Sequence, residues 1–351
     1  MRNDGMGDFI MSLPALHLLR KNFEACHITI LIPAWQGELA FASNIFDEII
    51  LFDDEKNQYL SSRPDFKKLF REMLGRAPYL RQKKFDMAID MRGDMRNRIV
   101  MFLASVPCRI GFDIGGMEWL LTHQVHYKEG VSEVEHFIDL ISSCTGKGHA
   151  ESVGCTIPAP AEDKEVVGQF LKANNITLGQ DVLIIVHPVS RWPAKEWPKE
   201  KFAALCDKLI SQRDAKVIMV GAVEDAESIN KILAQMKEAP ALFTGTLVQL
   251  SALLKKADLF IGNDTAPMHM AALLRTPTIA LFGPTDPEIY GPYGEGHSVV
   301  RPDIPCLCSS KKICRNPKRF CMDTISVERV FGIAEKYINR LSKEPYKMDV
   351  L

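Results

Sequence analysis

The strongest constraint on the fold is the alternation of strand-like and helix-like segments in the second half of the chain. The run VLIIVHP (182–188) is continuously apolar and β-branched, and residues 199–213 then show helical periodicity. Residues 215–222 and 224–236 repeat the pair, and the pattern continues through 241–283. Strands separated by helices of about 10–15 residues predict βαβ units and a parallel, doubly wound sheet.

The first half repeats this α/β pattern less regularly. Residues 54–84 are charged, and we expect them to be helical with a basic end. Short strands are expected at four places, namely 27–33, 47–53, 85–93 and 109–113. The sequence therefore predicts two Rossmann-like domains whose strand ends face a shared cleft, where ligands of such sheets bind.

A length of 351 residues fits two domains, since one core rarely grows beyond about 250–300 residues. We place the linker near 156–165, a stretch rich in proline, alanine and charge. This gives an N-terminal domain over 1–160 and a C-terminal domain over 161–325. The segment 326–351 carries a last helix that we expect to pack back toward the N-terminal domain.

Composition excludes several classes of protein. The net charge of −1 lacks the basic excess of most nucleic-acid-binding proteins, so no nucleic-acid partner is expected. No apolar run approaches the roughly 18–20 residues of a membrane helix, and the N-terminus lacks a signal-peptide pattern. We therefore expect a soluble cytoplasmic protein.

The segment GNDTAPMH (262–269) follows a strand and opens a helix. Asp264 and Thr265 stand at the helix start, where oxygen atoms cap free N–H groups and where anions bind. A plain capped helix explains the same residues. His269, taken alone, is more often a packed histidine than a functional one.

Two more loops follow strands of the same predicted sheet. The loop HPVSRWPAKEWP (187–198) combines rigid Trp–Pro pairs with Ser190, Arg191 and Lys195, a set that suits a phosphate or diphosphate. The alternative is a packed surface loop with solvated cations. The turn FGPTDP (282–287) would form a third wall of the same cleft.

The N-terminal loop raises a different question. Gly5 and Gly7 let the backbone approach a ligand or a neighbouring domain, and Asp8 stands at the start of a helix over 9–20. A carboxylate there stabilises the helix dipole by about 0.3–1 kcal/mol. The functional alternative is a general base that faces the cleft.

Four cysteines are clustered as Cys306, Cys308, Cys314 and Cys321. In a cytoplasmic protein such a group favours a structural metal (Zn or Fe) or reduced thiols over a disulfide, although the spacing is not the usual pair of zinc ligands. The basic residues between them form either a solvated face or a surface for anionic lipid head groups or a phosphorylated acceptor. These residues are Lys311, Lys312, Arg315, Lys318 and Arg319.

A second charged loop, AIDMRGDMRNR (88–98), follows a strand of the first half. Arg92, Arg96 and Arg98 are candidates for binding an anionic acceptor. A solvated helix face is the alternative.

Taken together and in this order, four motifs resemble the ADP-heptose:lipopolysaccharide heptosyltransferases, glycosyltransferase family 9, which have the GT-B fold. The motifs are RNDGMGDFIMSLPAL, HPVSRWPAKEWP, GNDTAPMHMAA and ALFGPTDP, and the resemblance runs from Arg2 to about Ile325. It implies an inverting enzyme that transfers heptose from ADP-heptose to a lipopolysaccharide core or lipid A acceptor. It also implies peripheral contact with the inner face of the inner membrane and no cofactor for catalysis.

The resemblance implies a role for each matched residue. Asp8 would be the catalytic base, Lys195 would neutralise the donor diphosphate, and Asp264 would bind the heptose hydroxyls. Thr265 and Ala266 would contact the phosphates at the helix start, and His269 would line the cleft.

The chain departs from the family pattern at several points. The family normally has an apolar strand before the position of Arg2, so we expect a gap in strand pairing, and either an upstream start or a truncated protein. Ala266 replaces a usual glycine, which is acceptable if its φ is helical. Small residues are usual where Val189 and Arg191 stand. Two other functions remain open: a related glycosyltransferase with another sugar or a protein acceptor, and a non-catalytic protein that binds nucleotide sugars.

Overall fold

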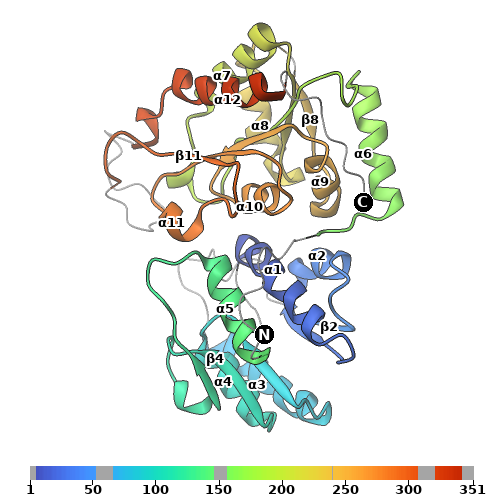
Figure 1. The fold of residues 1–351 in the computed structure, drawn as a ribbon, viewed down its shortest axis with the longest axis vertical. Helices are drawn as coiled ribbons and strands as arrows, with labels where there is room; N and C mark the ends of the chain where they lie inside the picture. Colours follow the sequence, from blue (N-terminus) through green and yellow to red (C-terminus); the bar gives the residue numbers. More distant parts are fainter. Residues whose placement is uncertain (1–4, 53–65, 146–155, 239, 307–320, 342–351) are drawn as a thin grey trace. The chain divides into compact units, whose positions relative to one another are not determined.

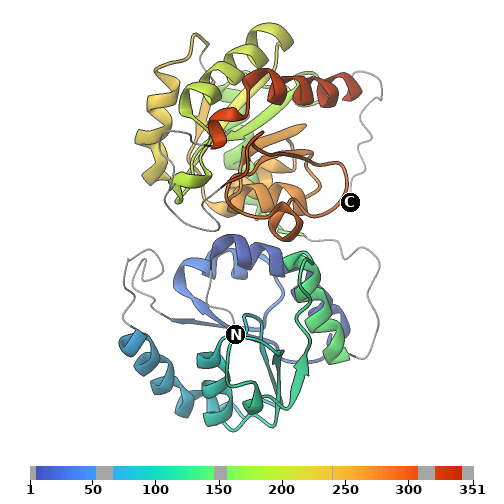
Figure 2. The same ribbon diagram turned by 90° about the vertical axis from the view of Figure 1, so that its left-hand side faces the viewer.

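The computed structural model describes residues 5–52, 66–145, 156–238, 240–306 and 321–341. The chain divides into two compact units, Met1–Cys155 and Thr156–Leu351, each with its own sheets and helices (Figures 1 and 2). The division falls five residues before the expected boundary. Ile157 explains the shift, because it is fully buried and its carbonyl accepts a hydrogen bond from Lys255 of the second unit.

A single parallel sheet of six strands organises the second unit. The strands lie in the order β11-β10-β9-β6-β7-β8, with β6 and β9 at the centre. All five side chains of β6 and of β9 are buried, as the continuous apolar runs in the sequence predicted. The strands are β6 Leu183–His187, β7 Lys216–Val220, β8 Ala241–Phe243, β9 Leu259–Asn263, β10 Thr278–Leu281 and β11 Ser298–Val300.

Helices of the second unit cover this sheet (Figure 1). The α-helices are α6 Ala161–Ala173, α7 Lys199–Arg213, α8 Ala226–Leu233, α9 Leu247–Leu254, α10 Ala266–Leu273, α11 Pro287–Tyr290 and α12 Val327–Leu341. Short 3-10 turns lie at η3 Pro193–Lys195, η4 Val223–Asp225 and η5 Cys321–Thr324.

The last helix, α12, packs within the second unit. Its apolar face, with Val330, Phe331 and Ala334, lies in the same core as β6 and α7. The expectation that this helix also packs toward the N-terminal domain stays a prediction.

The first unit contains two separate parallel sheets. One pairs β1 Thr29–Pro33 with β2 Glu48–Phe52, and the other has the order β3-β4-β5. No strand pairing joins the two sheets within the described ranges. The strands of the second sheet are β3 Met87–Asp90, β4 Cys108–Phe112 and β5 His123–Val125.

Side-chain packing holds these two sheets together. Leu31 and Phe52 of the first sheet share an apolar cluster with Val100 of the helix that follows β3. Helices α1 and α5 also pack against one another, as do α3 and α4. The helices of this unit are α1 Met6–Asn22, α2 Gly37–Ala42, α3 Phe66–Gln82, α4 Met95–Leu103 and α5 Glu133–Thr145, with 3-10 turns η1 Ala34–Gln36 and η2 Glu118–Leu120.

Candidate functional site

Asp264 is the centre of a polar cluster at the carboxyl edge of the second-unit sheet. It follows β9 directly, and its side chain is 3% exposed. The Lys195 ammonium donates a hydrogen bond of 2.6 Å to Oδ2 of Asp264, and the Thr285 hydroxyl donates one of 2.5 Å to the same atom. Because β6, β9 and β10 are neighbours in the sheet, the three loops that follow them converge on this carboxylate.

The electrostatics of the cluster keep Asp264 ionised. Burial alone would raise the pKa of the Asp264 carboxyl, but the nearby His269 imidazole and the charge of Lys195 outweigh it. The pKa is lowered to about 2. His269 Nε2 lies 3.6 Å from Oδ1 of Asp264, so this histidine belongs to the cluster. A buried anion beside a cation suits the binding of sugar hydroxyls and a diphosphate together.

Asn263, which the sequence did not single out, fixes the loop that carries Lys195. Its Oδ1 accepts a hydrogen bond of 3.0 Å from the backbone N–H of Trp197, and its Nδ2 donates one of 3.0 Å to the carbonyl of Pro188. Trp197 is fully buried, and its indole N–H donates to the carbonyl of Ile325. The Lys195 ammonium also lies 4.7 Å from the centre of the Trp192 ring, a cation–π contact.

Ser190 and Arg191 precede Lys195 in the same loop. The Ser190 hydroxyl accepts a hydrogen bond of 3.1 Å from the N–H of Trp192, and the N–H of Ser190 donates to Glu196. Burial raises the pKa of Glu196, against the opposing effect of that hydrogen bond. Arg191 is exposed. Ser190 therefore holds the turn, and only its remaining hydrogen-bonding capacity is available to a ligand.

The start of α10 has no side-chain cap from Thr265, so its N–H groups are oriented as in helix ends that bind anions. Thr265 precedes the helix, but its hydroxyl does not cap it. The hydroxyl instead donates to the carbonyl of Asn263 and lies 3.1 Å from Nδ1 of His187. Burial lowers the pKa of His187 to about 4, so its imidazole is neutral near pH 7. Ala266 is the first residue of α10 and does not adopt a positive φ, so alanine is compatible with this position.

Asp8 lies in the first unit, in the first turn of α1. Its Oδ2 accepts a hydrogen bond of 3.0 Å from the backbone N–H of Gly5, and the side chain is partly exposed. A Cβ atom at Gly5 would lie 2.7 Å from that oxygen, so a larger residue there would require the Asp8 side chain to shift. The carboxylate therefore stabilises the start of α1, and its role as a base is a separate proposal.

Arg98 does not lie where an acceptor could reach it, and its assignment as an acceptor-binding residue was wrong. Its side chain is fully buried, and its guanidinium donates to the carbonyls of Phe112, Ile114 and Gly116. It also pairs with buried Asp90 at 3.2 Å. The physical reason is that the loop after β4 has carbonyl groups that need donors in the interior.

The other two arginines differ from Arg98. Arg96 binds Asp94 with both carboxylate oxygens within 3.0 Å of its Nε. Arg92 has 27% of its side chain exposed and lies 3.9 Å from Asp94. Arg92 is therefore the most accessible of the three.

The cysteine cluster is only partly within the described residues. Cys306 packs against the core of the second unit, and Cys321 is buried in it. Cys308, Cys314 and the basic residues between 311 and 319 lie outside the described residues. Within the ranges that the structure describes, no group of three or more potential metal ligands is present.

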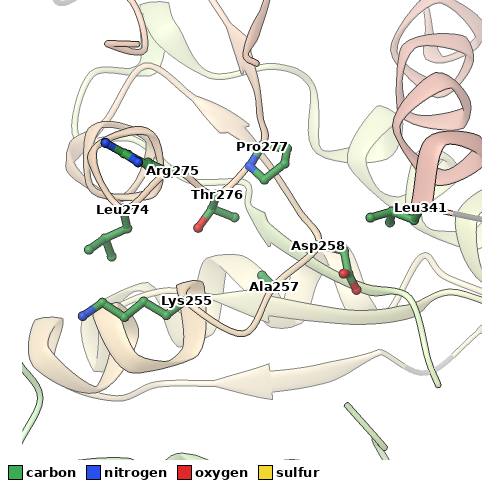
Figure 3. A pocket seen from close by; sticks show the side chains of 8 residues that line it. All are labelled: Lys255, Ala257, Asp258, Leu274, Arg275, Thr276, Pro277 and Leu341. Atoms are coloured by element: carbon green, nitrogen blue, oxygen red, sulfur yellow. The ribbon is translucent and has the colours of Figure 1, made fainter. Parts of the chain in front are cut away.

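A shallow pocket of about 160 Å³ lies at the opposite edge of the same sheet (Figure 3). Asp258 and Pro277 line it just before β9 and β10 begin, whereas Asp264 follows β9. Figure 3 shows Lys255 and Arg275 on one side of the pocket and Asp258 on the other. The Asp258 carboxylate accepts a hydrogen bond from the N–H of Leu183, a structural role. None of the predicted site residues lines this pocket.

Comparison with known proteins identifies the family. Residues 74–319 match the family described as glycosyltransferase family 9 (heptosyltransferase). The chain is 25% identical over 307 residues to lipopolysaccharide heptosyltransferase 2 of Escherichia coli, covering 84% of this chain and 85% of that protein. It is also 25% identical over 291 residues to a putative glycosyltransferase of Haemophilus influenzae, covering 80% and 81%.

The fold agrees with this match. The crystal structure of a family 9 glycosyltransferase from Veillonella parvula superposes with a TM-score of 0.82 at 24% identity, covering 97% of this chain and 96% of that one. The E. coli ADP-heptose lipopolysaccharide heptosyltransferase II superposes with a TM-score of 0.72 at 21% identity, covering 97% and 100%. The expected GT-B architecture of two Rossmann-like domains is confirmed. The chain is an enzyme of glycosyltransferase family 9.

Proposed function

We propose that this glycosyltransferase moves heptose from ADP-heptose to a lipopolysaccharide core acceptor, with inversion at the anomeric carbon. The observation that carries the proposal is the convergence of Lys195, Thr285 and His269 on the buried carboxylate of Asp264. The names of the relatives support heptose as the sugar and lipopolysaccharide as the acceptor.

On the donor side, the reaction needs stabilisation of the charge that develops on the departing ADP. Lys195 would supply a cation to the diphosphate, and the N–H groups at the start of α10, at Thr265 and Ala266, would supply hydrogen bonds. Asp264, ionised and buried, would accept hydrogen bonds from the heptose hydroxyls. Ser190, Arg191 and His269 would complete the donor contacts.

On the acceptor side, a base must take the proton from the attacking hydroxyl. We assign this role to Asp8. The acceptor oxygen forms a bond to the anomeric carbon as the bond from that carbon to the ADP oxygen breaks, and ADP leaves with the electron pair. Arg92 and Arg96 remain the candidates for holding the anionic acceptor.

A calorimetric titration with ADP-heptose, ADP-glucose and UDP-sugars tests the donor assignment. We expect ADP-heptose to bind best. Lys195→Ala or Asp264→Ala should weaken its binding, while Lys172→Ala, at an exposed position of α6, should leave its binding unchanged.

Asp8→Ala should abolish turnover and keep the donor affinity. A folded chain that binds no nucleotide sugar would overturn the proposal, and a preference for another sugar would point to a related glycosyltransferase. Full donor binding without turnover in the unmodified chain would instead indicate a non-catalytic binding protein.

The cysteine cluster is a separate proposal of a structural Zn or Fe site, with reduced thiols and a disulfide as the alternatives. The described part of the chain supplies two of the four thiols, Cys306 and Cys321, both on the core of the second unit. Metal analysis of the purified chain tests this. One bound metal per chain, lost in Cys308→Ser and kept in Cys206→Ser, is the expected result. No bound metal in the unmodified chain would contradict it.

We also propose that the enzyme works at the inner face of the inner membrane, because its acceptor is anchored there by lipid.

A further inference from the structure

An apolar surface lies exposed on the first unit. Helix α4 presents Met95, Phe102 and Leu103 to solvent, with Phe102 51% exposed. The loop after β4 adds Ile114, Met117 and Trp119, and Trp119 is 74% exposed. None of the helices in the described ranges combines the length and apolar character that crossing a membrane requires.

These side chains form one surface rather than scattered contacts. A Cβ atom built on Gly116 would lie 4.0 Å from the Cβ of Met95, so the loop lies against the start of α4. At the other end of the helix, the Arg109 guanidinium lies 5.6 Å from the centre of the Phe102 ring and donates a hydrogen bond to the carbonyl of Leu120. The loop and the exposed face of α4 are therefore continuous.

Helix α3, which packs beside α4, gives this surface a strong positive charge (Figure 1). Residues 66–84 contain seven lysines and arginines and one glutamate. Arg71, Arg81 and Lys84 are exposed. A helix this basic beside an apolar surface matches the pattern of proteins that bind a membrane interface.

Three carboxylates near the apolar surface are held by hydrogen bonds within the unit. Asp94 is held by Arg96, and Glu118 accepts a hydrogen bond of 2.6 Å from the N–H of Gly116. Asp113 accepts one of 2.8 Å from the N–H of Tyr127. The acidic groups are thus already engaged, and the exposed charge contributed by α3 is positive.

We infer that the α3–α4 surface, defined as Arg71, Arg81 and Lys84 of the α3 segment with Met95, Phe102, Leu103, Ile114, Met117 and Trp119, docks on an anionic lipid bilayer. The cations bind lipid phosphates, and the apolar side chains enter the head-group region, where tryptophan is favoured. A second copy of the chain fits less well, because two surfaces of the same positive charge repel one another. The inference rests on the proposed function, since a lipid-anchored acceptor is what brings the enzyme to a membrane.

Flotation of the full chain with vesicles tests the inference. We expect binding to vesicles of equal parts phosphatidylglycerol and phosphatidylcholine, and little binding to phosphatidylcholine alone. The double variants Arg81→Glu/Lys84→Glu and Trp119→Ser/Phe102→Ser should each weaken binding by about tenfold or more. Matched controls on the second unit are Lys164→Glu/Lys172→Glu and Val223→Ser/Leu178→Ser, which alter similarly exposed side chains and should bind as the unmodified chain does.

Three results would overturn the inference: no vesicle binding by the unmodified chain, equal losses in the controls, or unchanged binding in both surface variants. Loss of a dimer in the apolar variant, with vesicle binding intact, would assign the surface to a second copy instead. Donor affinity and turnover on a water-soluble core acceptor, measured in parallel, separate this inference from the proposed function. If the variants retain both and the unmodified chain ignores vesicles, the docking surface fails while the heptosyltransferase proposal stands.

Discussion

Lys195 and Asp264 lie 69 positions apart in the chain and form one buried ion pair. Removing one partner of such a pair leaves a charge in the interior without compensation, which is costly even when the intact pair contributes little. Lys195 is 16% exposed and Asp264 3% exposed, so solvent offers the carboxylate little replacement. The residues proposed to bind the donor are therefore also structural residues.

The first prediction concerns this pair. Lys195→Met should lower the free energy of unfolding of the second unit by about 3 kcal/mol, because Asp264 keeps only Thr285 and His269 as side-chain partners. Urea unfolding, followed by the fluorescence of the buried Trp197, measures the loss. The double variant Lys195→Met/Asp264→Asn should recover part of it. An unchanged urea midpoint in the single variant would show that the ion pair does not contribute to the stability of the second unit.

The site shows what a sequence can and cannot reveal about single residues. The meeting of the loops that carry Asp264, Thr265 and Lys195 could be predicted, because each loop follows a buried apolar strand. The bridging role of Asn263 and the contact between His187 and Thr265 could not, since the partners are 66 and 78 positions apart. Arg98 was misassigned because a charged residue in a helix is usually solvated, and only the fold reveals the carbonyls around it.

At the scale of elements, β3, α4 and the loop after β4 form one structure around Arg98. The backbone of the loop comes so close to the preceding turn that a Cβ atom at Gly115, where φ is +92°, would lie 1.7 Å from the carbonyl oxygen of Gly93. Asn97 adds a hydrogen bond of 2.8 Å to Asp90 at the end of β3. Arg98 thus supports the loop that carries Ile114, Met117 and the start of η2.

The second prediction tests this supporting role. Arg98→Ala should lower the free energy of unfolding of the first unit by about 3–5 kcal/mol, because it removes the cation that pairs with buried Asp90 and the donor to three loop carbonyls. Arg92→Ala, the more exposed neighbour, should change stability by less than about 0.5 kcal/mol. Thermal unfolding of both variants measures the difference. Equal stabilities would return Arg98 to the acceptor candidates.

The elements themselves were predictable where the pattern is long and apolar. The run 182–188 became β6 Leu183–His187, and 27–33 became β1 Thr29–Pro33. The edge strand β5 His123–Val125 escaped prediction because its three residues are polar or partly exposed. The packing of α12 in the core of the second unit was not predicted either. An amphipathic pattern shows that one face of a helix is buried, but it does not show which unit buries that face.

At the scale of the molecule, the two units have separate cores, and the histidines whose pKa burial lowers belong to the second unit. His187 and His297 have lowered pKa values because both are buried, and both belong to the second unit. Burial raises the pKa of Glu196 and of Asp258 in the same unit, which acts in the opposite direction. A comparison between variants is therefore needed to isolate one histidine.

The last prediction concerns His187. In the unfolded chain, the imidazole of this residue binds a proton below about pH 6.5. In the folded unit, burial lowers its pKa to about 4, so it stays neutral until about that pH. Because the unfolded state then binds more protons, stability rises with pH across this range and falls on acidification, by up to about 3 kcal/mol. His187→Gln places an amide near Thr265 instead of the imidazole and does not titrate, so its stability should depend less on pH between these values. Urea unfolding of both proteins at about pH 7 and about pH 4 measures the two slopes. Asp264, whose pKa is lowered to about 2 in the folded unit, also begins to lose its contribution near pH 4, where the unfolded carboxyl starts to bind protons, but this loss is common to both proteins and cancels in the comparison. Equal slopes in the two proteins would show that His187 is already protonated in the folded unit, and the neutral partner assigned to Thr265 would then be wrong.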